Sequence, residues 1–369
     1  MKTANLPIGP IQLFCLLFQA QFGLGVLSLP HAVDADAGQD GWIACLICGL
    51  INLILLLVIW ILSKQNRSIT VFQMLRQRLG PWIGGLFNLA IAAYSITVSY
   101  ETLANWVFIS NLWAYENTPA WMLSLLLVGG CAFLVSNPVR VFARFAVFTM
   151  AFVPLFIALI CYTLKDANLD YILPVFSTGL AKISLGAWSG MMSYAGIGIL
   201  MVLSPHIQMP SKTVLRIAIT ANIAITAVYM LCAFSTTVIF STEMIGFIRE
   251  PLLFQFKTIS FKIMERTDLM VQTIWILFIM TSLSTYLLLY MSAVTALSNA
   301  RKGVRLPALL AVALVLIGAG AWKLNVSQLT KLQDIIALYV PAAAIGMVLM
   351  MLIMVYLHKW LSGRKGARA

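Results

Sequence analysis

Charged side chains are scarce in this sequence. Asp, Glu, Lys and Arg make up 10% of the 369 residues, whereas soluble domains contain about 25%. Hydrophobic residues make up 61% and lie in long uninterrupted runs, which are typical of transmembrane helices. This composition excludes soluble, disordered, collagen-like and disulfide-rich proteins, and it predicts a membrane protein with several spans.

Motifs of enzymes and metal sites are missing as well. The sequence has no Walker loop, no H-E-x-x-H and no G-x-S-x-G, the motifs of phosphate binding, zinc hydrolysis and serine hydrolysis. One C-x-x-C pair occurs without a second pair, so a zinc or redox site is not indicated. We therefore expect no enzyme, no metal site and no cofactor.

The apolar runs predict an all-α integral membrane protein with ten transmembrane helices. About 20 residues are needed to cross the hydrocarbon, and only a helix pairs its own backbone groups there. We expect the spans at approximately 11–32, 42–62, 83–113, 120–136, 141–164, 187–206, 214–240, 269–298, 306–322 and 335–357.

The net charge of +12 resides in short segments between these runs. It excludes a nucleic-acid partner and indicates topology signals beside the lipid bilayer. With a cytoplasmic N-terminus, every inner segment contains basic residues and no acid, as the positive-inside rule requires. We expect one transmembrane domain, 1–369, with both termini inside and a cytoplasmic tail at 358–369. The outer amphipathic segment, 241–268, either lies on the membrane or caps an outer vestibule.

A short motif occurs in both halves of the chain. Gly23-Leu24-Gly25-Val26-Leu27 in the first span is echoed by Gly196-Ile197-Gly198-Ile199-Leu200 in the sixth. Because five spans separate the two copies, the halves 11–164 and 187–357 would be inverted repeats. Chance recurrence of common residues is the alternative.

The same motifs predict breaks in the first and sixth helices. A broken helix exposes backbone groups, which are tolerated only where they line a cavity, and helix ends there suit a carboxylate or an ammonium group. Close packing of small residues is the alternative. The candidate ligand-binding residues at the breaks are Gly23, Leu24, Gly25, Val26, Ser193, Tyr194, Gly196 and Gly198.

Two further spans supply candidate side chains. Tyr94, Thr97 and Glu101 follow one face of the third span. A carboxylate at this depth costs on the order of 3 kcal/mol, so Glu101 should face the interior. It would bind a ligand ammonium, carry a proton or hold water, unless it only makes structural hydrogen bonds. The eighth span is rich in hydroxyls, including Ser282 and Thr285, although such groups often bond only their own helix.

Together, these features resemble those of a known protein family. The first-span motif is followed by Pro30, then by Gln39-Asp40-Gly41-Trp42 and by a basic loop that ends in Leu79-Gly80. This pattern resembles the GerAB-like B subunits of spore germinant receptors, a branch of the amino acid–polyamine–organocation permease superfamily. The resemblance covers nearly the whole chain in length, span layout and charge asymmetry.

The resemblance implies a five-plus-five inverted-repeat, LeuT-like fold with broken helices one and six and a pocket between spans one, three, six and eight. It implies recognition of a germinant, an amino acid or a similar small molecule, in the spore inner membrane. The partners would be a germination A subunit and a C lipoprotein. By position, the two breaks would contact the ligand's carboxylate and amino groups, and Tyr94 and Glu101 would line the pocket. The alternative is an amino acid permease that is proton-coupled through Glu101.

Overall fold

Helices form all the regular secondary structure in the part of the chain that the structure describes. The computed structural model describes residues 7–23, 25–260, 265–298, 303–322 and 324–366. Its α-helices are α1 (Pro10–Phe22), α2 (Leu29–Ala37), α3 (Gly41–Ser63), α4 (Val71–Trp113), α5 (Ala120–Ser136), α6 (Val139–Met150), α7 (Val153–Thr163), α8 (Gly179–Gly190), α9 (Ile199–Leu203), α10 (Ser211–Phe247), α11 (Pro251–Lys257), α12 (Thr267–Leu297), α13 (Arg305–Gly320) and α14 (Val326–Gly366). The 3-10 helices are η1 (Gly38–Asp40), η2 (Leu164–Asp166), η3 (Leu169–Ile172), η4 (Met191–Tyr194) and η5 (Ser204–His206).

The apolar helices confirm an all-helical membrane protein. Among the described residues, seven helical stretches are long and apolar enough to cross a membrane, and α1, α5 and α13 are shorter apolar helices. All ten expected spans fall on helical segments. The number of crossings nevertheless stays a prediction, because length and composition alone qualify only the seven.

Breaks occur where the sequence predicts them, in the first and sixth spans. The chain leaves helical structure between α1 and α2, and again between η4 and α9. A third interruption, which the sequence analysis did not foresee, separates α6 from α7. The third span also extends further than expected, because α4 begins at Val71 and is kinked where Gly80 (φ 82°) precedes Pro81; proline cannot continue the backbone hydrogen-bond pattern.

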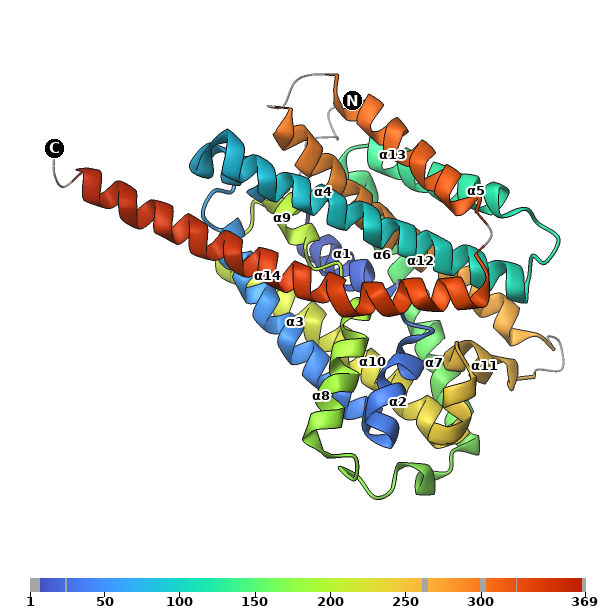
Figure 1. The fold of residues 1–369 in the computed structure, drawn as a ribbon. Coiled ribbons are helices and arrows are strands. Elements are labelled where there is room, and N and C mark those ends of the chain that lie inside the picture. Colours follow the sequence, from blue (N-terminus) through green and yellow to red (C-terminus); the bar gives the residue numbers. More distant parts are fainter. Residues whose placement is uncertain (1–6, 24, 261–264, 299–302, 323, 367–369) are drawn as a thin grey trace.

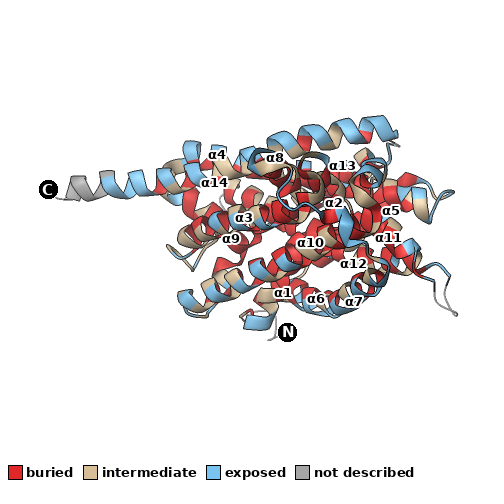
Figure 2. Cartoon of the chain, turned by 90° about the horizontal axis from the view of Figure 1, so that it is seen from below, coloured by how far each residue is buried: buried red, intermediate tan, exposed pale blue. Residues whose placement is uncertain are grey.

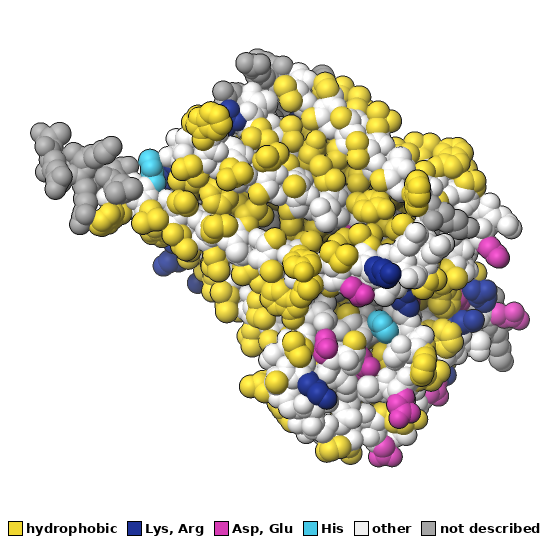
Figure 3. All heavy atoms as spheres, viewed as in Figure 1, with side chains coloured by type: hydrophobic (Ala, Val, Ile, Leu, Met, Phe, Trp, Pro, Cys, Tyr) yellow, Lys and Arg dark blue, Asp and Glu magenta, His cyan; other side chains and the backbone are white. Residues whose placement is uncertain are grey.

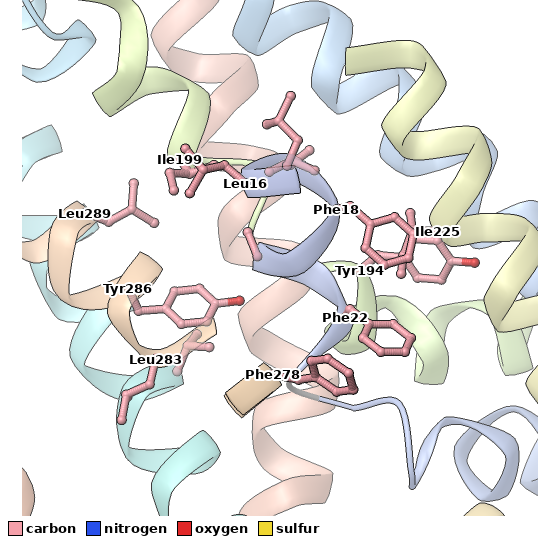
Figure 4. Close-up of a cluster of buried hydrophobic side chains, with 14 of the residues drawn as sticks. Leu16, Phe18, Phe22, Tyr194, Ile199, Ile225, Phe278, Leu283, Tyr286 and Leu289 are labelled. Atoms are coloured by element: carbon pink, nitrogen blue, oxygen red, sulfur yellow. The ribbon is translucent and has the colours of Figure 1, made fainter. Parts of the chain in front are cut away.

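Inner helices surround α1. It packs against α6, α10 and α12, while α12 runs along α4, and α14 runs beside α4 and passes in front of α3 (Figure 1). Figure 2 shows long exposed stretches on α14 and mostly buried residues on the interior helices. At the end of α1, the Phe22 ring lies 4.8 Å from Phe278 and 5.3 Å from Phe156, centroid to centroid (Figure 4). This aromatic cluster fixes the point where the first helix stops.

The Gln39-Asp40 motif ties the two halves of the chain together. Asp40 is fully buried, and its carboxylate accepts hydrogen bonds from the Phe176 and Thr178 amides at 2.8 and 3.2 Å. It also accepts one from the Thr178 hydroxyl at 2.8 Å. Gln39 donates to the Pro174 carbonyl at 2.7 Å. The motif therefore anchors the loop that enters α8.

The outer segment is packed against the helix bundle. Leu252, Leu253 and Phe256 of α11 are fully buried, and α11 contacts α2, α7, α10 and α12. The apolar side chains of α11 thus face the bundle, while the two placements left open by the sequence stay predictions; residues 261–264 lie outside the described part. Figure 3 shows the visible acidic side chains at this end of the molecule, opposite the projecting end of α14, with an apolar surface between. This distribution fits a bundle embedded in lipid.

Candidate ligand site at two broken helices

The break in the first span is held by α12. The Gly23 amide donates to the Ser282 hydroxyl at 3.2 Å, and the Trp275 indole donates to the Gly23 carbonyl at 3.1 Å. The Ser282 hydroxyl also lies 3.2 Å from the Ala20 carbonyl oxygen. Backbone groups released where α1 ends are therefore paired by side chains of one neighbouring helix, as a membrane interior requires. Leu24, a predicted site residue, lies outside the described residues.

The break in the sixth span requires a glycine. Gly196 has φ +122°, a backbone conformation that other residues rarely adopt. A Cβ atom there would also lie 2.4 Å from the Ala20 carbonyl oxygen. The sixth span thus presses its backbone directly against α1.

The two breaks meet each other. A Cβ atom on Gly25 would lie 2.1 Å from Ser193 Oγ, so the first break touches the sixth without space for a side chain. The Tyr229 hydroxyl lies 2.7 Å from the Gln21 carbonyl oxygen and 3.0 Å from that of Ser193. One tyrosine of α10 therefore bridges both segments. Val26, beside this contact, is fully buried.

A cavity of about 70 Å³ adjoins the break in the sixth span. Four of the predicted site residues line it: Tyr94, Tyr194, Gly196 and Gly198. The Tyr194 hydroxyl points away to donate to the Cys45 carbonyl at 2.8 Å. The remaining walls are mostly apolar and come from α3, α4, η4, the sixth-span break, α9, α12 and α14: Asn52, Leu55, Ile59, Ile91, Met191, Met192, Ala195, Ile197, Met201, Leu289, Pro341, Ala344, Ile345, Met347 and Val348.

The walls of this cavity differ from the expected pocket. Among the described residues, none of the first span's break lines it, whereas the second and tenth spans do. The reason is packing: Gly25 is closed off by Ser193, and Ser282 is bonded to Gly23 rather than directed into the cavity. Thr285 bonds the Thr281 carbonyl of its own helix at 2.9 Å.

Thr97 and Glu101 lie apart from the cavity. Thr97 is exposed and bonds the Ala93 carbonyl of its own helix at 3.1 Å. Glu101 is buried, as predicted, and its Oε2 atom has no hydrogen-bond partner among the described residues. Gln333 lies in the same polar cluster. It donates to Asn105 at 3.1 Å and accepts from Arg249. The third span therefore contributes side chains to two separate sites: Tyr94 lines the cavity, and Glu101 belongs to an outer polar cluster.

Sequence reasoning missed a buried amide network below the breaks. The Asn52 amide donates to Gln21 and to Asn222, both at 2.7 Å, and Asn222 donates to the Gly49 carbonyl at 3.0 Å. This amide network connects α1, α3 and α10. Amide side chains inside apolar spans were the available signal, because such residues are costly in lipid and seek one another.

A second, larger cavity of about 600 Å³ opens at the end of the bundle that the sequence predicts to be cytoplasmic. Val202 and Leu288 line it, and their chain neighbours Met201 and Leu289 line the smaller cavity. A thin layer of α9 and α12 therefore separates the two. Within the described residues, no group of three or more His, Cys, Asp or Glu is arranged to hold a metal ion.

Comparison with known proteins identifies the family. Residues 7–320 match the spore germination protein family. The chain belongs to this family. The resemblance to GerAB-like B subunits is thereby confirmed, and this spore germination protein is a receptor- or permease-like integral membrane protein rather than a member of an enzyme family.

Relatives of this spore germination protein are distant in sequence. Spore germination protein GerQB of Bacillus cereus is 26% identical over 278 residues, which are 75% of this chain and 76% of that protein. Spore germination protein A2 of Bacillus subtilis (strain 168) is 25% identical over 216 residues, 58% of this chain and 59% of that protein. Spore germination protein B2 of the same strain is 22% identical over 220 residues, 59% and 60% of the two chains.

A solved structure shows the fold. The crystal structure of MhsT in complex with L-phenylalanine matches with a TM-score of 0.67 at 13% identity, over 96% of this chain and 89% of MhsT. This spore germination protein therefore has the LeuT-like fold of MhsT.

Proposed function

We propose that this chain is the nutrient-recognition subunit of a germination receptor in the spore inner membrane. Its ten spans place both termini in the cytoplasm, and it binds an amino acid near mid-membrane. It then signals to a germination A subunit and a C lipoprotein. The observation that carries the proposal is the contact between the two breaks, Gly25 on Ser193 and Gly196 on Ala20, beside a small cavity.

The chemistry of the breaks suits a zwitterion. The N-terminal end of α2 carries partial positive charge, and the C-terminal end of α1 carries partial negative charge. A ligand that extends from the cavity to their junction would separate Gly25 from Ser193, and it would place its carboxylate toward α2 and its ammonium toward α1. MhsT, which has the same fold, was solved in complex with L-phenylalanine.

The size of the cavity favours a small amino acid. Each water-sized position needs roughly 10–15 Å³, so about 70 Å³ holds roughly five to seven positions. Glycine and alanine are of this size. Larger side chains would require the wall formed by α14 to move.

Binding to the isolated chain tests the proposal. The full chain in lipid nanodiscs is titrated with each common L-amino acid, and its thermal transition is followed. A small amino acid should raise the transition, because ligands that bind only the folded state stabilise it. Ala195→Leu, which puts three more carbon atoms into the cavity, should abolish the effect, whereas Thr97→Ala should leave it unchanged. No stabilisation by any amino acid would contradict the proposal.

A second candidate function is transport by the same site. The thin layer between the two cavities, Met201 with Leu289 above and Val202 with Leu288 below, favours it. Transport of this kind would be proton-coupled through the buried Glu101. Uptake of labelled alanine into liposomes that hold only this chain, with and without a pH gradient, distinguishes the two. Concentrative uptake would contradict a receptor-only function. Binding without uptake would support the receptor-only function.

A further inference from the structure

The outer cap, residues 248–257, carries charged groups that the proposed ligand site does not use. Arg249 and Glu250 precede α11, and Glu250 is 4% exposed. The two side chains form a loose ion pair with 3.9 Å between Arg249 Nε and Glu250 Oε1. The Arg249 guanidinium also lies 5.0 Å from the centre of the Phe108 ring, and it reaches Gln333 of α14. The cap is thus attached to α4 and α14 through one arginine.

This group has two buried acids and one base. Glu250, Glu101 of α4 and the exposed Asp334 act on the charge of Arg249, and the charge of Glu101 opposes the ionisation of Glu250. Within the described part of the chain, neither oxygen of Glu250 has a hydrogen-bond partner, and Glu101 Oε2 has none either. Burying two carboxylates against one guanidinium leaves an uncompensated charge, which is costly unless a proton neutralises it.

Burial and the nearby charge of Glu101 both favour the protonated form of Glu250, which lies outside the membrane-spanning helices. Burial raises the pKa of its carboxyl to about 8; Arg249 lowers the pKa and Glu101 raises it. Other charged groups belong to the elements that pack on α11. From α12, Asp268 is paired with Arg266 at 2.8 Å. The others are exposed Glu243 on α10, whose Lys212 and Arg216 lie at its opposite end, and His31, Asp34 and Asp36 on α2; α7 brings none. Lys257 ends α11 itself and lies over the Trp113 ring, and Asp334 of α14 acts on Arg249.

The cap is connected to the breaks by packed rings. Phe256 of α11 lies 5.3 Å from Phe156, and Phe156 lies 5.3 Å from Phe22 at the end of α1. Gln255 is hydrogen-bonded to Thr163 of α7. Movement of the cap would therefore uncover the aromatic cluster at the first break.

We propose that Glu101, Arg249 and Glu250 form a proton-binding site that holds the outer cap closed, and that loss of the proton releases the cap. This inference rests on the proposed function in one respect: the proposed function supplies the nutrient site that the cap would cover. A carboxyl with a raised pKa in the closed form stabilises that form at low pH, and the stabilisation is lost as the pH rises toward the raised value. Between pH 4.5 and about 8 the ratio of closed to open cap should fall about tenfold per unit.

Amide hydrogen exchange of the full chain in nanodiscs, without nutrient, tests this site. The protection of amides 252–257 is expressed relative to an unstructured peptide at the same pH. It should fall about 30-fold between pH 6 and pH 7.5 in the native chain. Glu250→Gln, a neutral mimic of the protonated acid, should stay protected with no pH slope. Glu243→Gln, an exposed acid on α10, should behave as the native chain does.

Two results would overturn the site: a flat pH profile of the native chain, or an unchanged slope in Glu250→Gln. The native profile needs no variant, so poor folding of one does not remove the test. No nutrient is present in this experiment, so its outcome is independent of the proposed function. The pH slope can be absent although the chain binds an amino acid, and the slope can be observed although the chain binds none.

Discussion

Adding one methyl group at Gly25 should separate the two broken helices. The new Cβ would lie 2.1 Å from Ser193 Oγ, 2.9 Å from its Cβ and 3.2 Å from its Cα. The hydroxyl can rotate away, but ordinary carbon contacts begin near 3.4 Å, so the two carbon contacts require the segments to shift by about 0.5 Å. Overpacking of this kind typically costs about 1–3 kcal/mol. We therefore expect Gly25→Ala to lower the thermal transition and to weaken amino acid binding by roughly 5- to 150-fold.

A compensating substitution makes this prediction specific. Ser193→Gly removes both atoms of the side chain that the new methyl would strike, and leaves only Cα at 3.2 Å. The double variant should therefore recover most of the stability and affinity that Gly25→Ala loses. Gly129→Ala is the matched control, because a Cβ there meets nothing within 4 Å and alanine favours helix.

The assay is a double-mutant cycle on the purified full chain, with thermal unfolding and amino acid titration of all four forms. Coupling of about 1 kcal/mol or more between the two positions would support direct contact of the breaks. Normal stability and binding of Gly25→Ala, or purely additive effects, would refute the packing on which the candidate site depends.

Three further predictions concern neighbouring residues. Glu101→Gln should abolish or shift the response to nutrient while membrane insertion stays normal; an unchanged dose–response curve would assign Glu101 a purely structural role. Tyr229→Phe removes the hydroxyl shared by Gln21 and Ser193 and should cost about 1–3 kcal/mol of stability, measured by thermal unfolding. Asp40→Asn should cost on the order of 2 kcal/mol, because three hydrogen bonds to a buried carboxylate weaken; a melting temperature equal to that of native protein would contradict it.

Local pattern was sufficient to predict the helices and their breaks. Apolar runs about 20 residues long predict helices in any membrane protein, and the G-x-G motifs mark the breaks because Gly196 needs a backbone conformation that only glycine adopts easily. The face of the third span was predicted less well. Thr97 lies at the edge of the stripe through Tyr94 and Glu101, since three residues turn an α-helix by only about 300°, and it is exposed.

The packing between distant segments could not be predicted from local sequence patterns. The tenth span carries no motif, yet residues from Pro341 to Val348 form one wall of the cavity. The contact of Arg249 with Gln333 joins positions 84 apart, and nothing near either residue indicates it. The third span's acid was correctly placed in the interior, but its partners come from the outer cap and α14. Such pairings depend on how whole helices assemble.

The residues that hold the breaks suggest how binding would be transmitted. Trp275 and Ser282 of α12 and Tyr229 of α10 supply the hydrogen bonds that the released backbone groups need. A ligand at the junction must satisfy some of the same groups, so it would compete with these side chains. Because a ligand shifts an equilibrium only by its differential affinity for two states, the signal would be a change in how α10 and α12 contact the breaks. Those two long helices reach both ends of the bundle, and α12 also borders the cavity at the end predicted to be cytoplasmic. If the proposed germination A subunit binds this chain, the surface on which it reads the ligand should therefore include the inner ends of α10 and α12.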